Sequence, residues 1–184
     1  GANDGALTVF DSLATKLRFA AAGGRAGCAF GGVAGRLSPD AAIGRADAPV
    51  AVAELDVSAD ARGVMLGGAV GFNESPDVYV IVQDSVFTAS AAGDGAYVGG
   101  VAGVQAAQAP DAEPGEAPRV VSVDNKFVVS GAGAMVGGLY GEQRGSAPAG
   151  LAERASIRST ADGALIGGIA GLNRGTLCGS EARS

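Results

Sequence analysis

Acidic side chains that recur at similar places in the chain are its best candidates for chemistry. The four that lie thirteen to fifteen residues before a Gly-Gly pair are Glu54, Asp84, Asp124 and Glu153. If the chain stacks on itself, these residues would form one acidic column. Such a column could bind calcium through six to eight oxygen ligands, or cleave a glycan with two carboxyl groups about 5–10 Å apart. Lys126, Arg154 and Arg158 lie nearby and favour a solvated polar face instead.

The rest of the chain lacks the groups on which most enzymes depend. It has no histidine, which removes the commonest general base and metal ligand. No GxxxxGK[ST] phosphate loop occurs. Of the two cysteines, Cys28 and Cys178, the second has no base nearby in the sequence and is expected to be a small buried side chain. We therefore expect a protein that is not an enzyme and uses no cofactor, with calcium as the alternative.

Aromatic side chains could also form a platform for sugars. The candidates are Phe72, Tyr79, Phe87, Tyr97 and Tyr140. They do not share one position in the repeat described below, so no aromatic stripe is visible. We expect them to lie in the core or at its edge.

All these residues are placed relative to a six-residue motif that recurs five times: FGGVAG, LGGAVG, VGGVAG, VGGLYG and IGGIAG. Its paired glycines are Gly31, Gly32, Gly67, Gly68, Gly99, Gly100, Gly137, Gly138, Gly167 and Gly168. The spacings between copies are 36, 32, 38 and 30 residues, a period typical of one supersecondary unit stacked on copies of itself. The pair either admits another backbone closely or forms a bulge at a corner.

A carboxamide follows the motif in four consecutive copies. These residues are Asn73, Gln105, Gln143 and Asn173, and Leu37 takes the place in the first copy. Amides at one position of successive units predict a ladder in which each side chain hydrogen-bonds the next.

A segment rich in β-branched and aromatic residues precedes each later glycine pair. These segments are 50–57, 78–88, 119–129 and 151–159, and each is expected to be a strand that ends in a small-residue turn. In the first unit, residues 7–19 are β-rich, and a weaker helical pattern covers 11–22. The linker 105–118 is rich in proline, alanine and acid, which predicts an exposed insertion.

Composition limits the interior and the partners. Of the 184 residues, 47% are hydrophobic but only 5% aromatic, which favours a thin, regular core of small side chains. The net charge is −6 and no basic patch exists, so nucleic acid and an anionic membrane surface are disfavoured as partners. No apolar run approaches the ~20 residues of a membrane-spanning helix. The first residues, GANDGALTVF, lack the pattern of a signal peptide.

These features together predict an all-β protein, a right-handed parallel β-solenoid of about five units of 30–38 residues. We expect a single repeat domain over 1–184, with units ending near 35, 71, 103, 141 and 171. Residues 172–184 would begin a truncated sixth unit or form a cap.

The motif resembles the GLUG repeat, whose consensus is valine-glycine-glycine-leucine-x-glycine. The closest copy is 137–141, GGLYG, and 173–178 resembles the continuation of the family repeat. The resemblance implies a solenoid region of a secreted or cell-surface bacterial protein, such as an adhesin, that belongs to a longer chain. It implies a non-catalytic module whose variable loops bind a host or cell-surface protein or glycan, without membrane insertion. A polysaccharide-processing β-helix enzyme and a pure stalk or spacer are the alternatives.

Overall fold

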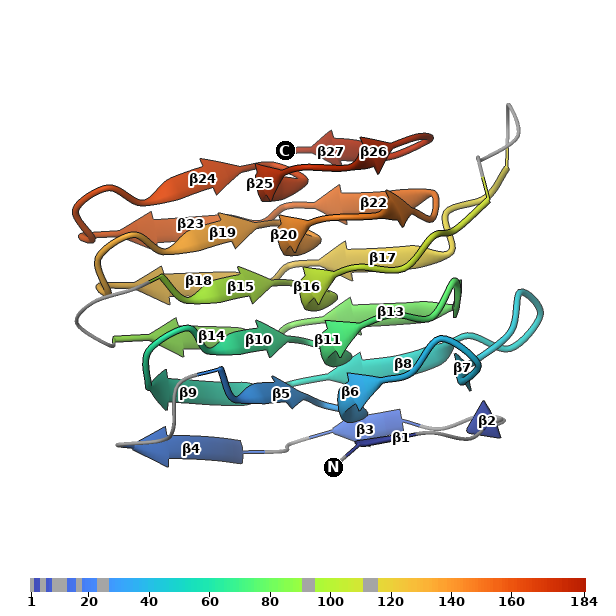
Figure 1. Ribbon diagram of the computed structural model, residues 1–184, viewed down its shortest axis with the longest axis horizontal. Coiled ribbons are helices and arrows are strands. Elements are labelled where there is room, and N and C mark those ends of the chain that lie inside the picture. Colours follow the sequence, from blue (N-terminus) through green and yellow to red (C-terminus); the bar gives the residue numbers. More distant parts are fainter. Residues whose placement is uncertain are drawn as a thin grey trace.

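The regular elements of the described chain are all strands, stacked coil upon coil (Figure 1). This computed structural model describes residues 27–90, 95–110 and 116–184, and the backbone of 2–3, 6–7, 13–15 and 18–22. Strands from successive coils pair in parallel and in register. The predicted β-solenoid is therefore confirmed.

The strand that enters each glycine motif and the strand that leaves it belong to two different sheets. The first sheet consists of β5 (Ala29–Gly31), β10 (Met65–Gly67), β15 (Tyr97–Gly99), β19 (Met135–Gly137) and β24 (Leu165–Gly167). The second sheet consists of β1 (Ala2–Asn3), β6 (Ala34–Leu37), β11 (Val70–Asn73), β16 (Ala102–Gln105), β20 (Tyr140–Gln143) and β25 (Ala170–Asn173). Each coil therefore bends at its glycine pair and continues in the next sheet.

Two further sheets close each coil on the opposite side of the core. The third sheet consists of β3 (Leu13–Thr15), β8 (Val50–Ala53), β13 (Val80–Gln83), β17 (Val120–Val123), β22 (Gly150–Glu153) and β27 (Glu181–Arg183). The fourth consists of β4 (Arg18–Ala22), β9 (Asp56–Asp60), β14 (Val86–Ala89), β18 (Lys126–Val129) and β23 (Ser156–Ser159). Short ladders between the second and third sheets are formed by β2 (Ala6–Leu7), β7 (Ala42–Ile43) and β12 (Asp77–Val78), and by β21 (Ser146–Ala147) and β26 (Thr176–Leu177).

Each β-rich segment expected to be one strand is interrupted by a bend and contains more than one strand. Residues 50–57, for example, contain β8 and the start of β9, with a bend between them. The residues at these bends have left-handed backbones although none is glycine: Glu54, Asp84, Asp124 and Arg154, with φ of 55°, 51°, 54° and 50°. The helix that a weak pattern indicated over 11–22 is a wrong prediction, because the described part of this segment forms the strands β3 and β4. Of the expected insertion at 105–118, residues 111–115 lie outside the described residues.

The paired glycines allow two backbones to approach closely. None of the ten has a positive φ, so the left-handed conformation is not the reason for glycine. A Cβ on Gly67 would overlap the carbonyl oxygen of Val70, and a Cβ on Gly68 would overlap the carbonyl oxygen of Gly100 and the side chain of Val82. The first glycine thus lets the second sheet fold against the first, and the second glycine faces the third sheet across the core.

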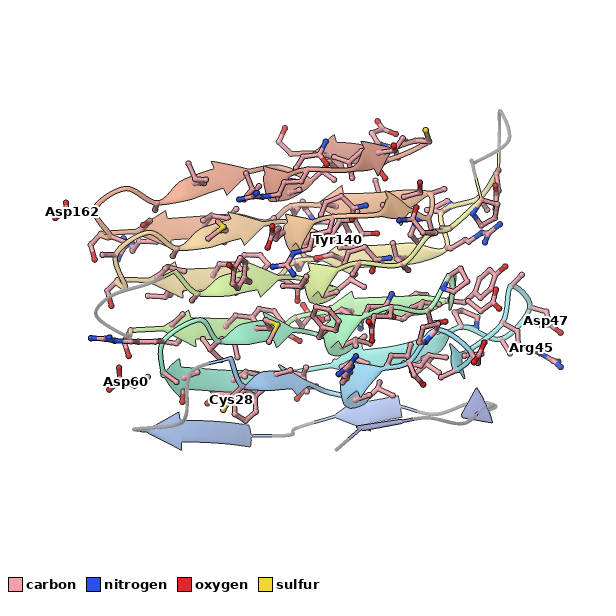
Figure 2. The ribbon with its side chains drawn as sticks, viewed as in Figure 1. Cys28, Arg45, Asp47, Asp60, Tyr140 and Asp162 are labelled. Atoms are coloured by element: carbon pink, nitrogen blue, oxygen red, sulfur yellow. The ribbon has the colours of Figure 1, made fainter. Side chains whose placement is uncertain are left out.

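The core is a set of columns of like side chains. Leu66, Val98 and Val136 lie above one another in the first sheet and are fully buried. Phe87 and Phe127 stack between coils of the fourth sheet, with ring centroids 5.2 Å apart. Charged side chains such as Asp60, at the end of β9, and Asp162 lie at one end of the coils, whereas Tyr140 lies in the middle of the stack (Figure 2). The thin apolar core expected from the composition is therefore built from these columns.

The glycine constraint predicts a large loss of stability in Gly68→Ala. The added methyl group must displace backbone rather than a flexible side chain, so we expect a loss of about 3 kcal/mol in the free energy of unfolding. Chemical denaturation monitored by circular dichroism measures it. Gly163→Asn is the matched control, because a Cβ there meets nothing within 4 Å and asparagine tolerates a left-handed backbone. Equal stability of Gly68→Ala and the parent would contradict the close approach.

Candidate functional site

The predicted acidic column is partly wrong. Hydrogen bonds place Glu54, Asp84 and Asp124 in consecutive layers. The Glu54 amide donates to the carbonyl of Gln83, which precedes Asp84, and the Asp84 amide donates to the carbonyl of Val123, which precedes Asp124. Glu153 is not in this column: it pairs with Val123 in the third sheet, one position before the bend. The bend of that coil is Arg154, so the fourth member of the column is a cation.

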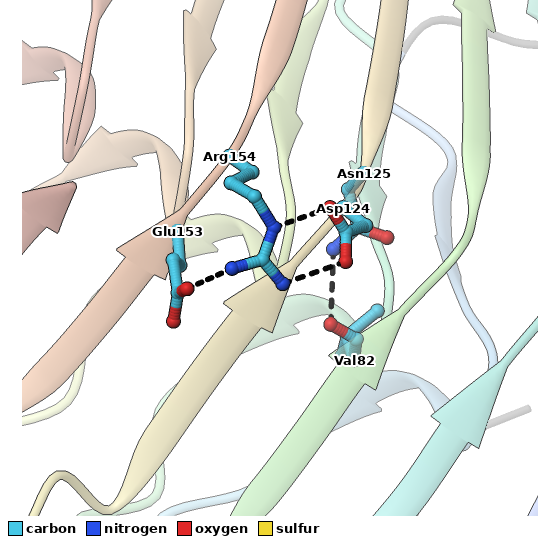
Figure 3. A network of polar contacts seen from close by, with 5 residues as sticks. All are labelled: Val82, Asp124, Asn125, Glu153 and Arg154. Carbon is cyan, nitrogen blue, oxygen red and sulfur yellow. Dashed lines mark hydrogen bonds and ion pairs between the residues drawn. The ribbon is translucent and has the colours of Figure 1, made fainter. Parts of the chain in front are cut away.

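Arg154 binds the end of the acidic column (Figure 3). Its Nε and Nη2 donate to the two carboxylate oxygens of Asp124 at 2.7 and 2.8 Å, and its Nη1 donates to Glu153. The hydrogen bonds from Arg154 lower the pKa of the exposed Asp124 carboxyl. An acidic residue of the column is thus used in an ion pair between coils and is not free for catalysis.

The described residues do not assemble a metal site from this column. No group of three or more histidine, cysteine, aspartate or glutamate side chains among residues 27–90, 95–110 and 116–184 is close enough to hold a metal ion. Calcium needs six to eight oxygens, and the bend residues point from an exposed corner in separate layers. The geometry favours a solvated, ion-paired face.

The Arg154 contact makes a prediction about titration. In Arg154→Gln, we expect the pKa of Asp124 to rise toward the ordinary value of 3.8. Because the folded-state pKa is lowered, the ion pair stabilises the fold above pH ~4 and this contribution is lost as the pH falls through the folded pKa. Carboxyl chemical shifts followed by NMR against pH measure both proteins. An unchanged Asp124 pKa in the variant would contradict the pairing, and Arg158→Gln provides a control of equal charge change.

The amide residues lie in one column on the inner side of the second sheet. Asn73 pairs in register with Gln105, Gln105 with Gln143, and Gln143 with Asn173. Asn73 Nδ2 donates to Gln105 Oε1 at 2.7 Å. Gln143 instead donates to the backbone oxygen of Gly145 at 2.7 Å. The hydrogen bond between Asn73 and Gln105 is thus the side-chain contact of the predicted ladder that forms. Gln143 and Asn173 instead bind backbone groups of the turn that follows each of them.

Three buried polar atoms near this column make no hydrogen bond within the described chain. They are Gln105 Nε2, Gln143 Oε1 and the Tyr140 hydroxyl. Burial raises the pKa of this hydroxyl above its ordinary value. Because the atoms are sealed inside the coil, they cannot meet a ligand from solution.

A second inner polar column was missed by the sequence analysis. Leu55, Ser85, Asn125 and Ala155 each follow a bend residue; the first three are buried, and the polar ones are Ser85 and Asn125. Asn125 Oδ1 accepts from the Ser85 amide at 2.9 Å. Its Nδ2 donates to the Val82 carbonyl at 3.0 Å, a contact drawn in Figure 3. Asn125 thereby satisfies backbone groups that the bend frees from the ladder. The available signal in the sequence was an asparagine directly after an acidic residue, inside a valine-rich segment.

Replacing Asn125 tests this role. Asn125→Leu keeps the number and branching of the side-chain heavy atoms but leaves the Ser85 amide and the Val82 carbonyl without their side-chain partner in the core. We expect a loss of about 3 kcal/mol in the free energy of unfolding, since each unsatisfied buried group costs about 1–3 kcal/mol. Thermal and urea unfolding measure it. Asn173→Leu is the matched control, because Asn173 is exposed and its Oδ1 accepts from the Gly175 amide; similar losses in the two variants would contradict the argument.

A groove runs over the outer corner between the first and second sheets. Its volume is about 500 Å³, and it is lined by Gly27, Ala29, Arg36, Gly63, Met65, Phe72, Tyr97 and Arg144. Along the first sheet, Leu66 and Val98 point into the core, so the preceding Met65 and Tyr97 face outward. The third glycine of the motif helps form this corner, because a Cβ on Gly71 would overlap the amide nitrogen of Phe30. We call this feature the corner groove.

Two ring–arginine pairs line the corner groove. The guanidinium of Arg36 lies 5.5 Å from the ring centroid of Phe72, and that of Arg144 lies 6.0 Å from the ring centroid of Tyr97. Phe72 and Tyr97 occupy different repeat positions, as the sequence indicated. The bend at the glycine pair nevertheless brings those positions together from two sheets. Of the other aromatic candidates, Phe87 and Tyr140 are buried in the core.

Carboxylates hold these arginines in place. Arg36 Nη2 lies 2.7 Å from Glu74 Oε2. Arg144 and Arg174 lie 2.7 and 3.1 Å from the carboxylate of Glu142, which is only 3% exposed. The Glu142 carboxylate raises the pKa of Arg144.

Comparison of the chain with known protein families, curated proteins and solved structures finds no match. No helix in the described part of the chain is long and apolar enough to cross a membrane. Neither Cys28 nor Cys178 is in a disulfide, and Cys178, which was expected to be buried, is only partly buried.

Proposed function

We propose that this chain is a non-catalytic structural and adhesive module of a secreted or cell-surface protein. The observation that carries the proposal is the continuous register of parallel coils, which presents one fixed outer surface along the stack. The resemblance of the repeat to the GLUG consensus supports a bacterial cell-surface setting. Such a scaffold binds through surface side chains and loops rather than through a closed catalytic pocket.

The arrangement of acids supports binding rather than turnover. Glycoside hydrolysis needs a pair of carboxyl groups facing one substrate. Asp124 is engaged by Arg154, and Glu142 is buried beneath Arg144 and Arg174. The corner groove, in contrast, offers half-buried rings and exposed guanidinium groups, which are groups suited to recognition. The module holds a ligand and leaves its bonds intact.

A combined binding and turnover assay tests this function. We expect the purified module to bind members of an array of surface glycans and matrix proteins. We also expect no new reducing ends when it is incubated with the glycans that it binds. Reducing-end release above that of the buffer would contradict a non-catalytic module. A complete lack of binding would contradict the adhesive role and favour a spacer.

A further inference from the structure

The corner groove extends along the axis of the stack. Ala29 and Arg36 come from one coil, Met65 and Phe72 from the next, Tyr97 from the third and Arg144 from the fourth. Three steps between coils, at about 4.8 Å each, span roughly 14 Å. A ligand that fills the groove is therefore elongated and lies across successive strands.

The polar groups of the groove favour an anionic ligand. Arg36 is 60% exposed and uses Nε and Nη2 on one oxygen of Glu74. Its Nη1 makes no hydrogen bond within the described residues. Arg144 and Arg174 share the single carboxylate of Glu142, which leaves one positive charge in excess on a chain whose net charge is −6. Guanidinium groups bind carboxylates through paired N–H donors.

The apolar groups favour a ring-shaped ligand. Phe72 and Tyr97 lie in adjacent coils and are half-buried, so each is fixed and still accessible from the groove. An aromatic ring offers a flat apolar surface, which fits the C–H face of a pyranose. A guanidinium lies over each ring, that of Arg36 at 5.5 Å from the Phe72 centroid and that of Arg144 at 6.0 Å from the Tyr97 centroid. One acidic sugar residue could thus place its C–H face against the exposed part of a ring and its carboxylate on the guanidinium that covers the rest of that ring.

The backbone of the groove argues against an extended peptide. A peptide that adds a strand needs unpaired N–H and C=O groups at the edge of a sheet. The walls of the groove are sheet faces: the Met65 amide donates to the Cys28 carbonyl at 2.8 Å, and the Tyr97 amide donates to the Val64 carbonyl at 2.8 Å. Recognition here depends on side chains alone.

We propose that the corner groove binds a short stretch of acidic polysaccharide, a chain of uronic-acid residues. This inference rests on the proposed binding function and names its ligand class and its site. Phe72 and Tyr97 carry the sugar rings, and Arg36 and Arg144 bind the carboxylates.

Isothermal titration calorimetry with tetragalacturonate tests the proposal, with its fully methyl-esterified form as the uncharged match. We expect the free acid to bind at least about tenfold more tightly than the ester, and the binding to weaken when salt is raised from about 0.05 M to about 0.5 M. In the double variant Arg36→Gln with Arg144→Gln, affinity for the acid falls about tenfold or more. Phe72→Leu and Tyr97→Leu each weaken binding of both the acid and the ester.

The double variant Arg45→Gln with Arg158→Gln is the matched control, because it removes two exposed positive charges outside the groove. We expect it to bind like the parent, and circular dichroism verifies that each variant is folded. Equal affinity of the two double variants for the acid would overturn the proposal. So would hexaglutamate peptide binding as tightly as tetragalacturonate. If tetragalacturonate fails to bind while the array of glycans and proteins shows other ligands, this inference is wrong and the adhesive function stands.

Discussion

The fold depends on the contact between the backbones of successive glycine pairs. Gly32 donates its amide to the carbonyl of Gly68 at 2.9 Å, and a Cβ on either residue would overlap the neighbouring coil or the facing sheet. Every coil bends at this point, so the backbone of each glycine pair lies in close contact with the glycine pair of the next coil. Each coil therefore needs glycine at the same two positions as its neighbours. The two sheets of the motif can fold against one another only where both side chains are missing.

Polar side chains inside the coils secure the places where the ladder is interrupted. Asn73 and Asn125 lie near different corners, and each binds groups in its own coil and in a neighbouring one. Apolar residues, Leu37 and Leu55, occupy the same columns nearer the N-terminus. The inner corners thus accept either an amide with satisfied partners or a leucine without polar atoms. Where an amide is present, it pairs buried backbone groups that would otherwise lack a partner at a cost of about 1–3 kcal/mol for each group.

The sequence predicted which segments of successive coils pair better than it predicted where each coil bends. The phase of the glycine motif indicated which segments pair, and the register of Asn73 with Gln105 follows from it directly. The bends at Glu54 and Asp124 were missed because valine-rich residues continue on both sides and no glycine or proline marks the break. Aspartate tolerates a left-handed backbone better than most residues, so the recurrent acids were a signal of bends as well as of charge. Glu153 was assigned to the column because spacing alone does not distinguish it from Arg154.

The corner groove could not be predicted from the repeat, because its two walls come from different repeat positions. Phe72 and Tyr97 are 25 residues apart in the sequence and approach each other only after the chain has bent and coiled. A search for one recurring aromatic position therefore finds nothing. The third glycine of the motif, at Gly71, contributes to this proximity because it carries no side chain that would separate the sheets.

The parallel register has a consequence for how such a chain can change over generations. Because every coil offers the same backbone contacts above and below, duplication or loss of a whole coil by recombination leaves the joints of the stack intact. The outer side chains are not equivalent in this way, since Arg36, Phe72, Tyr97 and Arg144 each occur in a different coil. Duplication or loss of coils would thus preserve the fold while it changes which side chains lie on the outer surface. The length of the scaffold and its recognition properties can therefore evolve at separate rates.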